Sequence, residues 1–199
     1  MDMSLKLMFS GLAMVLTFVA FVPYIRSILA GRTRPHVFSW FIWGITTVIV
    51  FFAQLEAEGG VGAWPIGLSG VITVGVAVLA FVKRGDISIT RTDWGFFVVA
   101  LASLPFWYLT SDPLWTVVVL SLVDLLGFGP TIRKAYAFPH EENQLFFLSF
   151  MLRNVFVILA LEHYSVTTVL FPLSIAAACT CLLMTVAYRR RVVLSDAAG

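Results

Sequence analysis

Seven apolar segments, each near the length that crosses a membrane as a helix, constrain this chain more than any other feature. A spanning helix needs roughly 17–25 mainly apolar residues. The segments cover about 8–29, 37–55, 64–82, 94–110, 114–133, 145–161 and 165–188. The chain is 60% hydrophobic and only 12% charged, with a mean hydropathy of +0.95, which is more apolar surface than one soluble core could bury. The sequence therefore predicts an all-α membrane protein with seven transmembrane helices.

Two of these segments allow another interpretation. The fourth is short, contains Pro105 and ends in Trp107 and Tyr108, so a re-entrant segment is the alternative to a span. The first begins near the amino terminus, as a signal peptide would. It has no small-residue cleavage site after a short apolar region, so we expect it to be part of the fold.

Basic residues predict the orientation. They follow the first, third, fifth and seventh segments: Arg26, Arg32, Arg34, Lys83, Arg84, Arg91, Arg133, Lys134 and Arg189 to Arg191. Only Lys6 is on the other side. Because loops rich in Lys and Arg stay cytoplasmic, we expect the amino terminus outside and the carboxyl terminus inside. The net charge of +2 then comes from cytoplasmic loops, which favours anionic lipid headgroups over nucleic acid as a partner.

An internal repeat appears when the sequence is compared with itself at an offset of 107 residues. The run Pro23-Tyr-Ile-Arg26 then aligns with Pro130-Thr-Ile-Arg133, and Pro65 aligns with Pro172. Each copy covers three apolar segments, and an odd number would insert a directly joined second copy upside down. The fourth segment has no counterpart and solves this problem as a linker helix. We therefore expect 1–85 to form one triple-helix bundle, 86–112 the inversion linker and 113–199 a parallel second bundle, as occurs in transporters.

The arrangement of three, one and three spans, with an outside amino terminus and a proline near the inner end of the first helix of each copy, resembles the PQ-loop/SWEET superfamily. That resemblance covers nearly the whole chain. It implies a seven-helix fold and relatedness to sugar SWEETs, Pnu-type vitamin-precursor transporters, cystinosin-like amino-acid exporters and the KDEL receptor. The chain departs from the family motif, because the Pro-Gln pair is Pro23-Tyr24 in one copy and Pro130-Thr131 in the other.

Pro23 and Pro130 are the candidate hinges. A proline inside a helix removes one backbone hydrogen bond and clashes one turn back, which permits bending. The resemblance implies the hinge role, and a static kink that improves packing is the alternative.

Asp124 and Arg153 are the strongest chemical signal, because each lies midway along an apolar segment. A charge at the bilayer centre costs on the order of 3 kcal/mol by insertion scales, so such residues normally face a cavity or a partner. One interpretation is a structural Asp124–Arg153 salt bridge. The other is that Asp124 exchanges a proton while Arg153 tunes it or holds an anionic group of a substrate. The resemblance to cystinosin-like proteins, which use an acidic residue on the fifth helix for proton coupling, favours the second.

The repeat makes this signal asymmetric. The positions equivalent to Asp124 and Arg153 in the first copy are Thr17 and Thr46, while Thr47 is the counterpart of Asn154. A site for a polar, asymmetric molecule explains charge in one copy better than a duplicated structural core does. Thr47 and Asn154 can both hydrogen-bond a ligand.

Aromatic residues complete the predicted site. Trp40 and Trp43 lie three residues apart on one helical face, and Phe150 is the repeat counterpart of Trp43. Trp43 and Phe150 are candidate substrate-binding residues, in line with the aromatic residues that the second and sixth helices of SWEET and Pnu proteins use. Trp40 could instead be an interfacial anchor near the basic loop.

The sequence thus predicts a transporter or facilitator for a small polar solute such as a sugar, amino acid or vitamin, working by alternating access, with proton coupling through Asp124 as a secondary hypothesis. A KDEL-receptor-like sorting or binding receptor is the alternative. We expect no enzymatic activity, cofactor, metal site or nucleic-acid partner, since no catalytic or metal-ligand constellation is visible. The expected location is the plasma (inner) membrane, with small-molecule solute and lipid as partners; a homo-oligomer is compatible with the sequence.

Overall fold

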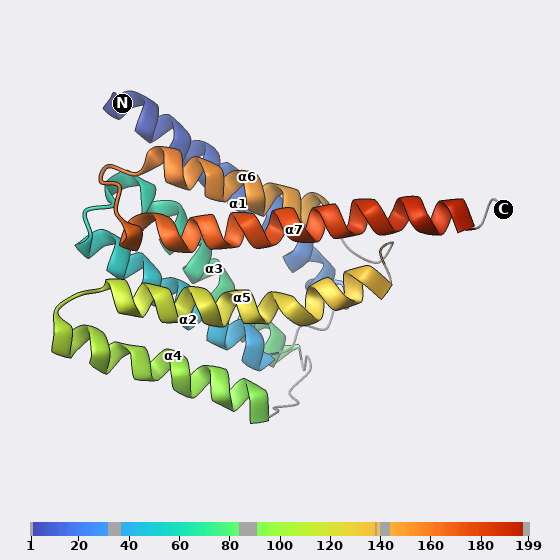
Figure 1. The fold of residues 1–199 in the computed structure, drawn as a ribbon, viewed down its shortest axis with the longest axis horizontal. Coiled ribbons are helices and arrows are strands. Elements are labelled where there is room, and N and C mark those ends of the chain that lie inside the picture. The colour runs from blue at the N-terminus through green and yellow to red at the C-terminus, as the bar shows by residue number, and fades with distance from the viewer. Residues whose placement is uncertain (1, 32–36, 84–90, 138, 140–143, 197–199) are drawn as a thin grey trace.

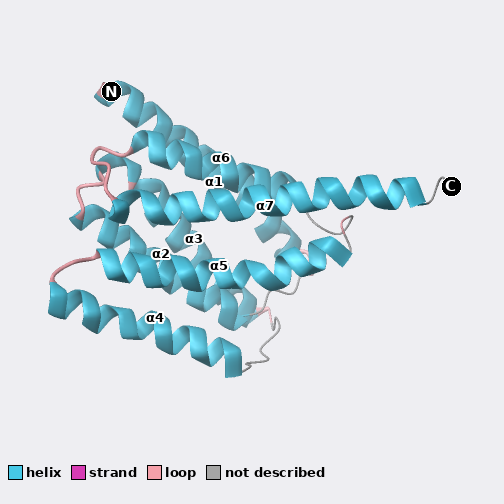
Figure 2. Cartoon of the chain, in the orientation of Figure 1, coloured by secondary structure: helices cyan, strands magenta, loops and turns pink. Residues whose placement is uncertain are grey.

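The computed structural model of the chain describes residues 2–31, 37–83, 91–137, 139 and 144–196. Its elements, in chain order, are α1 (Met3–Leu29), α2 (Val37–Glu56), the 3-10 turn η1 (Gly60–Gly62), α3 (Trp64–Val82), α4 (Arg91–Thr110), α5 (Leu114–Ala137), α6 (Gln144–Ala160) and α7 (Val166–Asp196). Figure 2 shows only helices and connecting loops in the described part of the chain. The all-α prediction is confirmed, and one long helix covers each predicted apolar segment.

Among the described residues, three helical stretches are long and apolar enough to cross a membrane: Met3–Leu29, Gly60–Val82 and Val166–Val192. Shorter apolar stretches occur in α2, α5 and α6, over Trp40–Glu56, Leu114–Leu126 and Gln144–Ala160. An integral, multi-pass membrane protein is the class that such a set indicates.

The helices form a bundle with two distinct ends (Figure 1). The N-terminal end holds the amino terminus and the α2–α3, α4–α5 and α6–α7 connections, and the C-terminal end holds the carboxyl terminus. In this bundle α3 packs on both α1 and α2, and α7 packs on both α5 and α6. The two sets of helices meet mainly where α1 contacts α6, with a smaller contact between α2 and α5.

Small residues let α3 approach α2 closely. A Cβ atom on Gly67 would lie 2.8 Å from the Phe51 ring, and one on Gly70 would lie 2.9 Å from Val48 Cγ2. On the α2 side, a Cβ on Gly44 would lie 2.7 Å from Val74 Cγ2. Packing of this kind is typical of helices in lipid, where apolar burial alone does not drive association.

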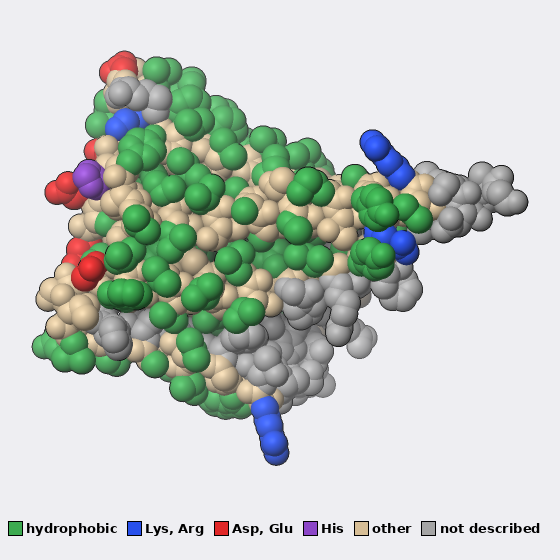
Figure 3. Space-filling view, in the orientation of Figure 1, with side chains coloured by type: hydrophobic (Ala, Val, Ile, Leu, Met, Phe, Trp, Pro, Cys, Tyr) green, Lys and Arg blue, Asp and Glu red, His purple; other side chains and the backbone are tan. Residues whose placement is uncertain are grey.

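Exposed side chains divide the surface into bands (Figure 3). Large apolar side chains are exposed along the bundle, among them Val71, Val78 and Leu126. The exposed acidic side chains of the described residues belong to the N-terminal end: Asp2, Glu56, Glu58, Asp112 and Glu162. Most of the exposed basic side chains that Figure 3 shows lie at the opposite end, whereas Lys6 donates to the Glu162 carbonyl at the N-terminal end. An apolar belt between two charged ends suits a bilayer.

Candidate functional site

Asp124 of α5 is buried and faces the other half of the chain. The hydroxyl Oγ1 of Thr46, on α2, lies 3.3 Å from Asp124 Oδ1. The same hydroxyl lies 3.0 Å from the carbonyl oxygen of Trp43. One hydroxyl carries one proton, so both acceptors compete for it. Among the described residues, the Asp124 carboxylate therefore has one hydrogen-bond donor, the Thr46 hydroxyl, which the Trp43 carbonyl also uses.

Arg153 of α6 is also buried, at 2% exposure. Its Nη2 donates to the backbone carbonyl of Pro65, at the start of α3, over 3.2 Å. Its Cζ lies 5.3 Å from the centroid of the Phe150 ring, within the range of a cation–π contact. Its Nε has no hydrogen-bond partner. A buried guanidinium with five donors is therefore only partly satisfied.

The structure does not form the salt bridge that the sequence allowed between these two residues. The carboxylate of Asp124 faces Thr46, and the guanidinium of Arg153 faces Pro65 and Phe150. Each charge instead contacts a group from residues 1–85. The interpretation of a mutual ion pair is wrong for this conformation.

Asn154, next to Arg153, is fully buried. Its Nδ2 donates to the carbonyl of Phe150 on the same helix over 2.8 Å, while its Oδ1 has no partner. Thr47 is buried as well. Arg153 and Asn154, neighbours on α6, therefore offer one unused donor, Nε, and one unused acceptor, Oδ1.

Two further buried polar side chains were missed by the sequence interpretation. Ser121 lies one helical turn before Asp124, and its hydroxyl has no partner. Gln54, near the end of α2, donates from Nε2 to the Thr168 carbonyl over 2.8 Å, and its Oε1 is unpartnered. A primary amide inside an apolar segment was the available signal for Gln54. Ser121 had no such signal, because serine is common in membrane helices.

Toward the C-terminal end, the rings of Phe21, Tyr24, Trp40, Phe146 and Phe150 form what we call the aromatic cluster. Tyr24 stacks on Trp40 with centroids 5.0 Å apart, and Phe146 stacks on Phe150 at 4.8 Å. Phe21 contacts Trp40 and Phe150 edge-on. These contacts join α1, α2 and α6 across the two halves.

The predicted aromatic residues belong to this cluster or its edge. Trp43 contacts Trp40 edge-on with centroids 5.7 Å apart and is half-buried. Trp40 itself is buried, and its alternative interpretation as an interfacial anchor near the basic loop stays a prediction. Phe150, a member of the cluster, contacts both Phe21 and Arg153.

At the N-terminal end, two loops are joined by what we call the loop clasp, made by Gly59, Val61 and Glu162. The Val61 amide donates to Glu162 Oε1 over 2.8 Å, and the Glu162 amide donates to the Gly59 carbonyl over 3.1 Å. Ser10 of α1 donates to the Val61 carbonyl over 2.7 Å. The clasp ties the α2–α3 connection to the α6–α7 connection.

The two candidate hinges fall inside helices. Pro23 is exposed within α1, which continues to Leu29. Pro130 lies within α5, and its side chain is outside the described residues. Their bending role stays a prediction.

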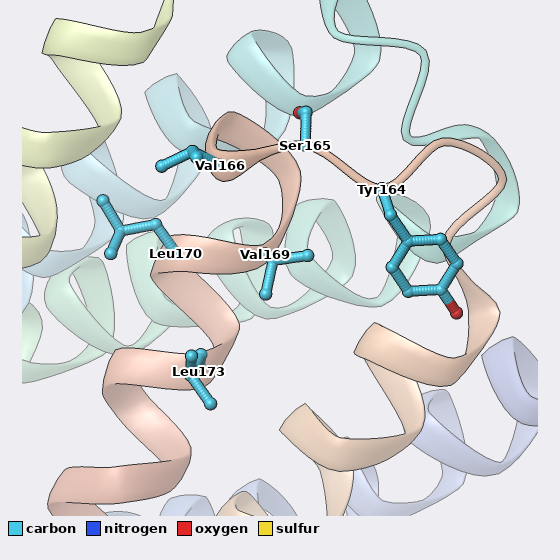
Figure 4. Close-up of a pocket in the computed structure, with 6 residues that line it drawn as sticks. All are labelled: Tyr164, Ser165, Val166, Val169, Leu170 and Leu173. Atoms are coloured by element: carbon cyan, nitrogen blue, oxygen red, sulfur yellow. The ribbon is translucent and has the colours of Figure 1, made fainter.

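A separate groove of about 510 Å³ lies where α7 begins. Figure 4 shows its lining side chains on the first turns of α7 and the loop before it. The lining residues are Tyr164, Ser165, Val166, Val169, Leu170 and Leu173. None of the predicted site residues lines this groove. Its mainly apolar walls offer little that would orient a polar solute.

Comparisons with protein-family models, curated proteins and solved structures found no match to this chain.

Proposed function

We propose that this protein is a membrane transporter or facilitator for a small polar solute, working by alternating access between residues 1–85 and 113–199. One observation carries the proposal: each buried charge of the second half is bonded to a group of the first half. Asp124 accepts from Thr46, and Arg153 donates to Pro65. A movement that separates the halves breaks both contacts at once and exposes both charges to an entering solute.

Helix packing supports two equivalent units. The offset of 107 residues makes α1, α2 and α3 the counterparts of α5, α6 and α7. In each unit the third helix packs on the other two, and the contacts between units, α1 with α6 and α2 with α5, are also equivalent pairs. We infer two parallel triple-helix bundles with α4 as the linker, as in the PQ-loop/SWEET superfamily that the sequence resembles.

The proposed orientation places the N-terminal end outside the cell and the C-terminal end in the cytoplasm. Lys83, Arg91 and Arg189 to Arg191 are at the proposed cytoplasmic end, and Lys6 is at the other. This distribution follows the positive-inside tendency. The proposed location is the plasma (inner) membrane.

Proton coupling through Asp124 is the finer part of the proposal. The Asp124 carboxylate accepts one shared hydrogen bond, from Thr46, so its oxygens have capacity left to take up a proton. The groups around it determine whether that proton can be released. Thr46 is the neighbour on α2, and two thiols lie on the apolar part of α7, Cys179 buried and Cys181 exposed.

The test is uptake by proteoliposomes of labelled lactate, succinate, glucose and glutamine, with and without an inward-acidic pH gradient. We expect at least one solute to accumulate above protein-free liposomes, and the gradient to raise its uptake. Asp124→Asn should abolish the response to the gradient.

Two results would contradict the proposal. Saturable binding without flux of any bound solute would favour a receptor of the sorting type. A gradient response that survives Asp124→Asn would remove the coupling role of this residue.

A further inference from the structure

Arg153 and Asn154 present a pair of unused hydrogen-bonding groups inside the protein. The Nε of Arg153 and the Oδ1 of Asn154 have no partners, although the two side chains are 2% and 0% exposed. An unsatisfied buried polar group costs about 1–3 kcal/mol, and more when it is charged. The one hydrogen bond that Arg153 makes to the described part of residues 1–85 is to the backbone carbonyl of Pro65. A neutral carbonyl oxygen balances the guanidinium charge less well than an anion would.

A guanidinium matches a carboxylate better than it matches one carbonyl oxygen. Two parallel N–H donors of arginine can hold both oxygens of a carboxylate. The Phe150 ring beside the guanidinium limits access of water to one side of it. The unpartnered Oδ1 of Asn154 accepts hydrogen bonds, so it suits a hydroxyl or amine next to that carboxylate.

The charge balance of the site adds a second constraint. With Asp124 ionised and Arg153 protonated, the two buried charges sum to zero. A carboxylate entering alone would leave the site at minus one, and a proton on Asp124 alone would leave it at plus one. If both arrive together the sum stays at zero, which avoids the cost of a net charge in the membrane interior.

Resting on the function proposed above, we propose that the transported solute carries a carboxylate, that Arg153 binds this carboxylate, and that one proton enters Asp124 with it. Arg153 then exchanges the carbonyl of Pro65 for the solute. The hydroxyl of Thr46, released from the Asp124 carboxylate, turns to the Trp43 carbonyl that it already reaches at 3.0 Å. The protonated Asp124 has the unpartnered Ser121 hydroxyl one helical turn away on the same helix.

Other ionisable groups have limited influence on this step. The helices packed against α5 are α2, α4 and α7. Among their described residues, Glu56 and Arg91 lie at helix ends, and Arg189 to Arg191 lie in the last turns of α7. Cys179 on α7 is a buried free thiol, and Cys181 on the same helix is an exposed one.

The experiment compares each acid with its own amide on the purified, full-length protein in detergent. The pairs are lactate with lactamide, succinate with succinamide, and benzoate with benzamide. Ligand that binds the folded state raises the melting temperature. We expect at least one acid to do so, with its amide at least tenfold weaker, and Arg153→Gln to remove that preference while Arg153→Lys retains part of it.

The pH dependence tests the proton. Between pH 7 and 8 these acids are almost fully ionised, so their own titration contributes little. While Asp124 is ionised in the empty protein, affinity should tighten by up to about tenfold for each unit that the pH falls, and Asp124→Asn should flatten that slope. The acid–amide comparison on the unaltered protein stands even if a variant fails to fold.

Some outcomes would overturn this inference. They are equal shifts for acid and amide, no shift with any acid, a shift with glucose alone, or acid binding without a pH slope. Transport measurements distinguish a failure of this inference from a failure of the proposed function. If glucose is transported and Arg153→Gln does not change that transport, the protein is a transporter but Arg153 is not a carboxylate site. If the protein binds acids selectively but transports none of them, the carboxylate site stands and the transporter function does not.

Discussion

The two ends of the bundle are closed by different interactions. At the N-terminal end the loop clasp consists of hydrogen bonds that involve backbone groups of Gly59, Val61 and Glu162. At the C-terminal end, the contacts that the described residues of the aromatic cluster make between the halves are contacts between rings. Glu162 is exposed, while Phe21 is 2% exposed.

This difference indicates which end opens more easily. A hydrogen bond contributes about 0.5–1.5 kcal/mol net, and water can replace its partners when the bond is exposed. Each aromatic pair contributes about 0.5–1.5 kcal/mol beyond the area it buries, and the rings share several partners. We therefore expect the N-terminal end to open first and the aromatic cluster to separate only with a larger input of free energy.

The largest fall in the free energy of unfolding should follow the loss of a ring from the aromatic cluster. Phe21→Ala removes the contacts with Trp40, Phe146 and Phe150, and should lower the free energy of unfolding by about 3 kcal/mol. Phe18→Ala is the matched control, because Phe18 is on the same helix and 49% exposed. Denaturation of both variants in detergent makes the comparison. Equal losses would mean that the cluster adds nothing to the closure of that end.

A methyl group added at Gly62, next to the loop clasp, should lower the free energy of unfolding by less. A Cβ on Gly62 would lie 2.7 Å from the backbone nitrogen of Leu161, so Gly62→Ala should force the two loops apart at a cost of about 1–3 kcal/mol. In Gly11→Ala the new Cβ meets no atom within 4 Å, and this control should be neutral or slightly stabilising. Thermal unfolding of the two variants measures the difference. An unchanged melting temperature in Gly62→Ala would show that the loops are not in firm contact.

The smallest effect should come from a single hydrogen bond of the clasp. Glu162→Ala leaves the Val61 amide without its acceptor at a cost of about 1 kcal/mol, so hydrogen exchange at Val61 should speed up roughly fivefold. Glu162→Gln keeps an acceptor oxygen and should retain most of the protection. The same exchange rate in all three proteins would rule out this contact as a closure.

The arrangement of the helices was largely predictable because lipid imposes strong rules on a sequence. Apolar length and basic residues at one end give segment bounds that lie within a few residues of α2, α3 and α6. The longest extension, α7, continues to Asp196, because Arg189 and Arg190 donate to the carbonyls of Tyr136 and Pro139 and hold the last turns in place.

The partners within the site were less predictable. The sequence marked Asp124 and Arg153 by their cost in lipid, yet their partners are a threonine hydroxyl and a backbone carbonyl. The identity of Pro65 does not predict that its backbone carbonyl will accept a hydrogen bond from Arg153. Glu162 was missed for a similar reason, since a carboxylate in a loop is usually solvated.

Tyr24 shows how a departure from a pattern can carry information. It lies where the motif of the PQ-loop/SWEET superfamily, which the sequence resembles, has glutamine, and the sequence interpretation treated it only as a mismatch. In the structure its ring stacks on Trp40 and contacts Phe146. A periodicity argument could have placed it with Phe21, three residues earlier on α1.

The most direct test of alternating access is the chemical accessibility of one cysteine placed between the halves. Thr47→Cys, in a background with Cys179→Ala and Cys181→Ala, puts a thiol at a buried position on α2. A membrane-impermeant maleimide is applied to right-side-out and to inverted vesicles. We predict modification from both sides, with Glu162→Ala raising the rate from the N-terminal side and Phe21→Ala raising it from the C-terminal side. Modification from one side only, whatever the variant, would contradict alternating access and favour a one-sided binding site.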